Sequence, residues 1–385
     1  MTPLKLPSFF KHSVLALGSE TNTTFSLLNK DTVFLSNPYQ DLKDLSVFEN
    51  FKNDILKERK SAGIKPDVIA CDMHPEYISA KYGRDIAGEK KGIHLIEVQH
   101  HHAHVVSCMA ENGLRGEVIG VAFDGTGYGA DGKIWGGEFL IAGYKDFERA
   151  AHIAYVPMPG GDKAVLEPIR MAFSYLYKAY KGNVSRVKAD ILRRLGKEKV
   201  GIFTRMAGKC VNSPLTSSAG RLFDAVASLI GVKDSISYEG EAAIALEKIA
   251  AAEGEGRYDF RLLANKGIID IGFESMIKEI ISDLRKEPAA VISRKFHNTI
   301  AEAVARVSVL LRKKQDLNKV VLSGGVFQNK ILLQETKKRL LGARFEVYLH
   351  SRVPSNDRGV SLGQAVIAAC KCESKHRLTQ IKRHR

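Results

Sequence analysis

The sequence predicts an α/β protein built from two similar lobes, and three observations lead to this prediction. Apolar strand-like runs alternate with helical patterns along most of the 385 residues, which is typical of α/β folds. A succession of strand, small-residue turn and returning strand occurs in residues 13–36 and again in residues 118–142, which indicates an internal duplication. The chain is also too long for one compact core, since about 100–200 residues per domain are usual.

The first lobe is expected over residues 12–115. Its pattern predicts the following elements in order: strands at 13–17, 25–29 and 32–36, a helix at 44–60, a buried strand at 67–71 and a helix from 99 to 111. A polar turn rich in Gly, Ser and Thr, residues 18–24, follows the first strand. Two lobes of this kind that face each other would leave a cleft between their small-residue turns.

The second lobe is expected over residues 116–370. Strands at 118–123 and 136–142 flank a glycine-rich turn, and a helical insertion occupies about 160–290. The remaining pattern predicts a helix at 289–314, a strand at 319–323, a turn at 324–325, a helix at 329–340, a strand at 345–350 and a closing helix at 360–369. The alternation of strands and helices indicates sheets that are at least partly parallel.

Charge and hydrophobicity along the chain exclude several classes of protein. Part of the net charge of +15 lies in a basic tail, residues 371–385, which we interpret as a solvated terminus. No RNP motif or zinc finger accompanies this charge, so a nucleic-acid partner is not expected. The first residues lack the pattern of a signal peptide, and no run approaches the about 18 apolar residues of a membrane span. We therefore expect a cytoplasmic protein without a membrane partner.

A run of histidines is the strongest local signal. Four of the twelve histidines lie in the stretch QHHHAH, residues 99–104. His100 and His104 are four residues apart, so a helix places them on one face, where two imidazoles can bind one metal ion. His101 and His102 point elsewhere and are candidates for contacts with phosphates or substrate.

Carboxylates are the expected third and fourth ligands. Asp124 follows an apolar strand, and Asp357 comes just before the predicted closing helix. Histidine and carboxylate together suit Mg, Mn, Fe or Zn. A helix N-cap is the other interpretation of Asp357.

Glycine pairs follow two apolar strands. Gly125 and Gly127 flank Thr126, and Gly324 precedes Gly325. Glycine lets backbone N–H groups approach a phosphate closely, although neither stretch matches the Walker A or dinucleotide-binding pattern. Asp224 lies on a predicted helix, where it could receive ribose hydroxyls or simply face solvent.

Taken together, these motifs resemble one family. Over roughly residues 12–370 the chain contains, in order, DMHPEY (72–77), QHHHAH (99–104), FDGTGYG (123–129), WGGE (135–138), PGGD (159–162), EP (167–168), SAGRLFD (218–224), LSGGVFQN (322–329) and NDRG (356–359). This combination resembles the C-terminal carbamoyl-transfer region of HypF, the carbamoyltransferase of [NiFe]-hydrogenase maturation.

The resemblance implies an actin/sugar-kinase-like (ASKHA) fold, in keeping with the duplication. It implies a divalent metal (Fe, Zn or Mg) held by His100, His104, Asp357 and, as a fourth ligand, Asp124. It also implies binding of ATP, AMP or carbamoyl-adenylate. The nucleotide contacts would be Gly125, Thr126, Gly127, Asp224, Gly240, Gly324, Gly325 and Asn329.

The reaction that the resemblance implies is transfer of a carbamoyl group from carbamoyl-adenylate. The acceptor would be the C-terminal cysteine thiol of a HypE-like partner, for synthesis of a cyanide ligand. A metal would polarise the carbamoyl carbonyl, and His101, His102 or His74 would relay the proton.

Full-length members of this family carry acylphosphatase-like, zinc-finger and YrdC-like regions upstream, and the C-x-x-C pairs of the zinc fingers do not occur in this chain. We therefore expect that adenylate formation needs a separate YrdC-like protein, whether the chain is a split subunit, a shortened paralogue or a piece of a longer protein. Three other functions remain open: tRNA threonylcarbamoyladenosine transferase, O-carbamoyltransferase and non-catalytic nucleotide-binding subunit.

Overall fold

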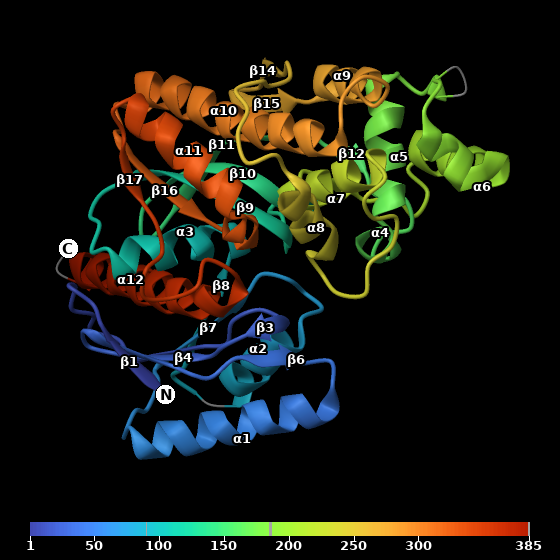
Figure 1. The fold of residues 1–385 in the computed structure, drawn as a ribbon. Coiled ribbons are helices and arrows are strands. Elements are labelled where there is room, and N and C mark those ends of the chain that lie inside the picture. The colour runs from blue at the N-terminus through green and yellow to red at the C-terminus, as the bar shows by residue number, and fades with distance from the viewer. Residues whose placement is uncertain (90, 185–186, 384–385) are drawn as a thin grey trace.

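A computed structural model describes residues 1–89, 91–184 and 187–383, with side chains described as far as residue 373. Two sheets lie one above the other with helices between them and on their outer sides (Figure 1). The blue N-terminal part of the chain forms the lower lobe, and most of the remaining chain forms the upper lobe.

The sheet of the first lobe has the strand order β1-β5-β4-β2-β7-β8. Its strands are β1 (Thr2–Lys5), β2 (Val14–Ala16), β4 (Ser26–Asn29), β5 (Thr32–Leu35), β7 (Val68–Asp72) and β8 (His94–Val98). β2 pairs antiparallel with β4 and parallel with β7. A two-stranded ribbon, β3 (Thr21–Thr23) with β6 (Tyr39–Asp41), lies beside this sheet.

The sheet of the second lobe repeats this topology. β9 (Val118–Tyr128), β10 (Ile134–Ala142) and β11 (Phe147–Ile153) form the antiparallel part, and β16 (Lys319–Ser323) and β17 (Glu346–Tyr348) the parallel part. The order β11-β10-β9-β16-β17 therefore corresponds to β5-β4-β2-β7-β8. This repeat confirms the duplicated actin/sugar-kinase-like architecture.

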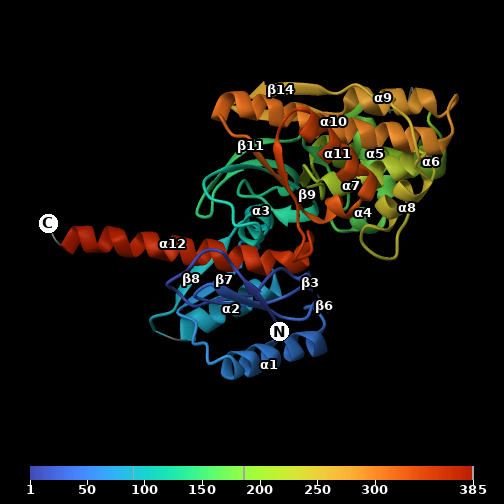
Figure 2. The same ribbon diagram turned by 60° about the vertical axis from the view of Figure 1, so that its left-hand side comes forward.

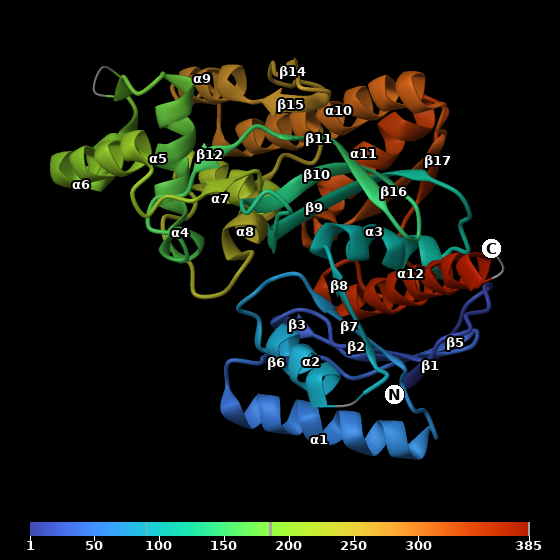
Figure 3. The same cartoon turned by 180° about the vertical axis from the view of Figure 1, so that it is seen from behind.

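The helix layer between the two sheets contains one helix from each half of the chain. α3 (His100–Glu111) packs on β9 and β16, and α12 (Val360–Arg383) packs on β2 and β7. The two helices also pack on each other, as the view from behind shows (Figure 3). All twelve residues of α3 are buried, as expected of a helix covered on every side. Each half of the chain thus contributes one helix that packs on the sheet of the other half. A single cut in the sequence therefore does not separate the two lobes.

The remaining helices cover the outer faces. α1 (Leu45–Ser61) and α2 (Ile78–Glu89) cover the first sheet, and α10 (Ala289–Gln315) and α11 (Lys330–Gly342) lie over the second. The predicted helical insertion contains α4 (Lys163–Leu166), α5 (Pro168–Ala179), α6 (Asp190–Lys209), α7 (Ala219–Leu229), α8 (Glu241–Ile249) and α9 (Glu274–Asp283). It also contains the hairpin β14 (Arg261–Asn265) and β15 (Ile268–Gly272), which extends the second sheet beside β11, and the short strand β13 (Leu215–Thr216), which pairs with β12 (Val156–Pro157).

Two predicted elements have a different extent in the structure, and several elements, such as β1, α2, β8, β11 and the hairpin β14–β15, were not predicted. Residues 124–128 were expected to form a glycine-rich turn, but they belong to strand β9. The reason is that β9 pairs with β10 as far as the pair Tyr128–Ile134. The closing helix does not end near residue 369 but continues as α12 through Arg383, beyond the body of both lobes (Figure 2). The side chains of the basic tail from residue 374 onward lie outside the described residues.

Among the described residues, no helix is both long enough and apolar enough to cross a bilayer. Among the described residues, Cys71, Cys108 and Cys210 form no disulfide.

Candidate functional site

The first turns of α3 bring two histidines to the middle of the molecule. The side chain of Gln99 caps the helix by accepting a hydrogen bond from the backbone N–H of His102 at 2.9 Å. His100 and His104 then lie one turn apart on the same face, with ring centroids 4.8 Å from each other. Both side chains are about 1% exposed.

Two carboxylates from distant parts of the chain meet these imidazoles. Asp124 comes from β9, and Asp357 from the short 3₁₀ helix η3 (Asp357–Gly359) that precedes α12. The ligand atoms of the four side chains all lie within 4.8 Å of one another. His104 Nε2 lies 2.9 Å from Asp124 Oδ2 and 3.5 Å from Asp357 Oδ1, and the corresponding distances from His100 Nε2 are 3.3 and 3.6 Å.

The electrostatics favour the ionised carboxylates. Burial opposes ionisation of Asp124, but the neighbouring imidazoles hold its pKa well below the ordinary value. Against the same effect of burial, His100 and His104 lower the pKa of Asp357 to about 2. Two imidazole nitrogens and two carboxylates in a buried cluster are a donor set that suits a divalent ion such as zinc or iron.

Neighbouring groups orient the ligands. Asp72, at the end of β7, accepts a hydrogen bond from His100 Nδ1 at 2.9 Å, which turns Nε2 toward the carboxylates. The backbone N–H of Gly325 donates to Asp124 Oδ1 at 3.0 Å. The capping interaction considered for Asp357 is made by Asn356, whose side chain accepts from the backbone N–H of Arg358. The carboxylate of Asp357 faces the histidines instead.

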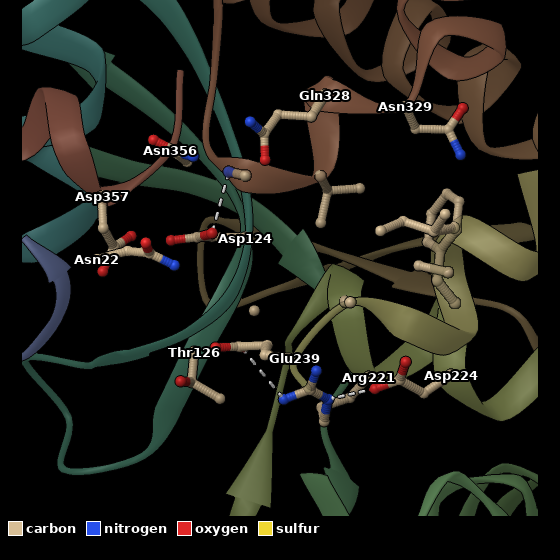
Figure 4. A pocket seen from close by; sticks show the side chains of 18 of the residues that line it. Asn22, Asp124, Thr126, Arg221, Asp224, Glu239, Gln328, Asn329, Asn356 and Asp357 are labelled. Carbon is tan, nitrogen blue, oxygen red and sulfur yellow. Dashed lines mark hydrogen bonds and ion pairs between the residues drawn. The ribbon is translucent and has the colours of Figure 1, made fainter. Parts of the chain in front are cut away.

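A cavity of about 260 Å³ opens beside the cluster. Asp124 and Asp357 line one end of it, and Phe223, Ala243 and Ile244 from α7 and α8 line another part. Figure 4 shows the labelled acidic and amide side chains around this space. An apolar wall beside a polar, metal-binding end is suited to a planar base with an attached charged group.

Several predicted nucleotide contacts line this cavity: Gly125, Thr126, Asp224, Gly240, Gly325 and Asn329. Asp224 is about 1% exposed, and burial raises the pKa of its carboxyl. Its Oδ2 accepts from Arg221 Nε at 2.8 Å, while Oδ1 has no hydrogen-bond partner. An unsatisfied oxygen in a cavity wall is suited to accept from a ribose hydroxyl. Asn329 caps α11 through its Oδ1, and its Nδ2 lies 2.9 Å from His297 Nε2.

Gly127 and Gly324 do not line the cavity, and each lies in a tight packing contact. A Cβ on Gly127 would come within 2.6 Å of His101 Cε1, so this glycine makes room for the histidines. Gly324 has a φ of +98°, and a Cβ there would lie 2.2 Å from the carbonyl oxygen of Phe123. It therefore allows β16 to end close against β9.

The three predicted proton-relay histidines are placed very differently. His102 lies on the other side of α3, where its Nε2 donates to the carbonyl of Gly143 at 2.7 Å, so its position does not support a relay at the cluster. His101 is fully buried beside His100, and its Nε2 has no hydrogen-bond partner. His74 stacks on Tyr77, a cavity-lining residue, at a centroid distance of 4.0 Å.

Sequence reasoning did not single out several residues of the site. In the sequence analysis Asp72 appears only within the DMHPEY motif. Like Asp124, it is a carboxylate that follows an apolar strand, and this signal could have identified it. Asn22 and Tyr77 bring the first lobe to the cavity. Arg221 and Glu239 lie beside predicted contacts, but only the folded chain shows that they lie 3.8 Å apart in the cavity wall.

Comparisons with known proteins agree with this architecture. Residues 120–364 match the family described as "Carbamoyltransferase, Kae1-like Domain, second subdomain", and residues 10–111 match the "HypF Kae1-like domain". The chain is 33% identical to carbamoyltransferase HypF2 of Cupriavidus necator over 92% of its own length and 46% of that relative. It is 32% identical to a carbamoyltransferase HypF homolog of the same organism, over 94% of the chain and 93% of the relative.

A solved structure has the same fold. The crystal structure of full-length HypF in a phosphate- and nucleotide-bound form superposes with a TM-score of 0.91 at 39% identity, covering 96% of this chain. The chain spans 48% of that protein and about half the length of HypF2, so it corresponds to one region of these larger proteins. The chain belongs to the HypF carbamoyltransferase family, of which it represents the Kae1-like region.

Proposed function

We propose that this chain transfers a carbamoyl group from carbamoyl-adenylate to a cysteine thiol of a HypE-like protein, in the synthesis of the cyanide ligand of [NiFe]-hydrogenase. The observation that carries the proposal is that Asp124 and Asp357 belong both to the four-residue cluster and to the wall of the cavity. A nucleotide in the cavity would therefore carry its reactive end next to the cluster. The names of the relatives support carbamoyl transfer as the reaction class.

The side chains have distinct tasks in this reaction. His100, His104, Asp124 and Asp357 would hold a divalent ion, which when bound polarises a carbonyl and stabilises developing negative charge. Asp224 would hold the ribose, and the apolar wall around Phe223 would hold the base. In the transfer the thiol sulfur bonds to the carbamoyl carbon, the bond from that carbon to the phosphate oxygen breaks, and AMP leaves. His101 and His74 remain the predicted side chains for the thiol proton.

We propose that the donor is made at another active site. A YrdC-like protein or domain would supply carbamoyl-adenylate, since both regions of this chain that match family models are Kae1-like. The proposed setting is the cytoplasm, with no membrane or nucleic-acid partner.

A transfer assay tests this function. The purified chain is mixed with carbamoyl-adenylate, generated by a YrdC-like enzyme, and with a HypE-like acceptor whose intact mass is then measured. A carbamoyl-sized gain on the terminal cysteine is expected, and it should disappear with His100→Ala and with His104→Ala. A chain that binds nucleotide but modifies no HypE-like protein would contradict the proposed acceptor. The assay would then be repeated with tRNA and with small hydroxylated metabolites.

A further inference from the structure

The cavity is strongly acidic, which poses a problem for a ligand that carries a phosphate. Five carboxylates line it, namely those of Asp124, Asp224, Glu239, Glu247 and Asp357. Arg221 is the only lysine or arginine among its lining residues. Like charges repel strongly where water is partly excluded. An anionic group can therefore bind only where a cation offsets these carboxylates.

Arg221 has an unused hydrogen-bonding group at this position. The residue belongs to α7 and is about 1% exposed. Its Nε donates to Asp224 Oδ2 at 2.8 Å, but its Nη1 has no hydrogen-bond partner. A buried guanidinium nitrogen without a partner is costly, and the planar guanidinium is well suited to phosphate oxygens. Because Nη1 makes no hydrogen bond, it indicates a ligand that completes the site.

A carboxylate lies where that ligand would bind. Glu239 belongs to the loop between α7 and α8, and its Oε1 is 3.8 Å from Arg221 Nη1. The same oxygen lies over the backbone of Gly125, where an added Cβ would come within 2.3 Å of it. Figure 4 shows Arg221 between Asp224 and Glu239, with Thr126 nearby. The side chain of Glu239 is 55% exposed, so it can leave this position at low cost.

We infer that Arg221 binds the phosphate of the nucleotide, and that the carboxylate of Glu239 occupies this anion position until the phosphate displaces it. The inference rests on the proposed nucleotide-binding function and adds a determinant of specificity. The cavity would select a nucleotide over a nucleoside through one guanidinium, at the end of the cavity formed by Gly125 and Thr126. Glu239 would weaken binding of every ligand with a phosphate at this position.

The test compares AMP with adenosine in calorimetric titrations of the full chain. Metal is removed with a chelator, so that Arg221 is the only cation in the cavity wall. Arg221→Gln should weaken AMP binding by about tenfold or more, the effect expected for loss of a charge-assisted hydrogen bond, with a much smaller effect on adenosine. Glu239→Gln should strengthen AMP binding several-fold and leave adenosine binding unchanged.

Glu247→Gln is the matched control for charge. Glu247 also lines the cavity, but its carboxylate accepts from the backbone N–H of Lys330. If Glu239 acts by direct competition, Glu247→Gln should strengthen AMP binding less than Glu239→Gln does. Equal effects of the two substitutions would overturn the displacement by Glu239.

Two results separate this inference from the proposed function. If wild-type chain binds AMP more tightly than adenosine and folded Arg221→Gln keeps the same ratio, the role of Arg221 is wrong while nucleotide binding stands. If wild-type chain binds neither ligand, the proposed nucleotide function fails and the inference fails with it. Thermal unfolding of each variant shows whether it is folded. Because Glu239→Gln changes a half-exposed side chain, it provides a test even if Arg221→Gln does not fold.

Discussion

Asp72 Oδ2 accepts a hydrogen bond of 2.9 Å from Nδ1 of His100, and both side chains are fully buried. Since a carboxylate only accepts, this contact places the proton of the imidazole on Nδ1 and leaves Nε2 to face Asp124 and Asp357. The first lobe supplies Asp72 from the end of β7, whereas Asp124 belongs to the second lobe. The orientation of one ligand therefore depends on the contact between the two lobes.

Replacement of Asp72 by Asn should weaken metal binding. The amide no longer provides a charged acceptor for Nδ1, and loss of such a supporting contact typically costs about 10–100-fold in metal affinity. Competition with a chelating dye measures this affinity. Asp67→Asn is the control, because Asp67 Oδ2 lies 2.6 Å from His12 Nδ1 just before β7 begins, at the opposite end of this strand from Asp72. An equal loss in both variants would contradict a specific role of Asp72.

Replacement of His104 and of His102 by Ala should have different effects on metal content. His104 Nε2 faces both carboxylates, whereas His102 Nε2 bonds to Gly143 O and its ring lies against Phe147. Elemental analysis should find little metal in His104→Ala and unchanged metal in His102→Ala. If both variants are folded and both have lost the metal, the assignment of His104, but not His102, as a metal ligand would be wrong.

Replacement of Gly127 by Ala should disturb the cluster through packing alone. The new methyl group would lie 2.6 Å from His101 Cε1 and 3.0 Å from His100 Cδ2, so both rings have to move. Overpacking of this kind typically costs about 1–3 kcal/mol of stability, and we expect weaker metal binding as well. Gly88→Ala is the control, because a Cβ at this helical position meets no atom within 4 Å. Unchanged stability and metal affinity in Gly127→Ala would contradict the tight contact.

Replacement of His297 by Gln should reduce the sensitivity of the fold to acid. Burial lowers the pKa of His297 to about 4, and its Nδ1 donates to Ser293 O at 2.8 Å. An unfolded histidine has a pKa near 6.5, so the unfolded chain takes up the proton more readily. The stability that His297 contributes is therefore complete above about pH 6.5 and decreases as the pH falls toward 4, by up to about 3 kcal/mol.

Urea unfolding between pH 4.5 and 8 measures this effect. The free energy of unfolding of the wild type should fall more steeply with acidification than that of His297→Gln, by about 1.4 kcal/mol per pH unit below pH 6. Parallel curves for the two proteins would show that His297 does not titrate differently in the folded and unfolded chain.

The sequence by itself indicated many of the elements and the residue types that form the four-residue cluster. Periodicity predicted α3 to within one residue, and the repeated hairpins predicted the duplicated sheets. The spacing of His100 and His104 was informative because helix geometry alone places them on one face. These are local properties, encoded in stretches of a few residues.

Tertiary structure decided the rest. Asp357 joins the cluster although 253 residues separate it from His104, because α12 crosses to the first lobe while α3 crosses to the second. Residues 124–128 form a strand because they pair with β10. His102 is directed away from the cluster, where it donates a hydrogen bond to the carbonyl of Gly143. The meeting of Arg221 and Glu239 depends on a loop between two helices. Contacts between segments far apart in the sequence have no local pattern, so only the folded chain reveals them.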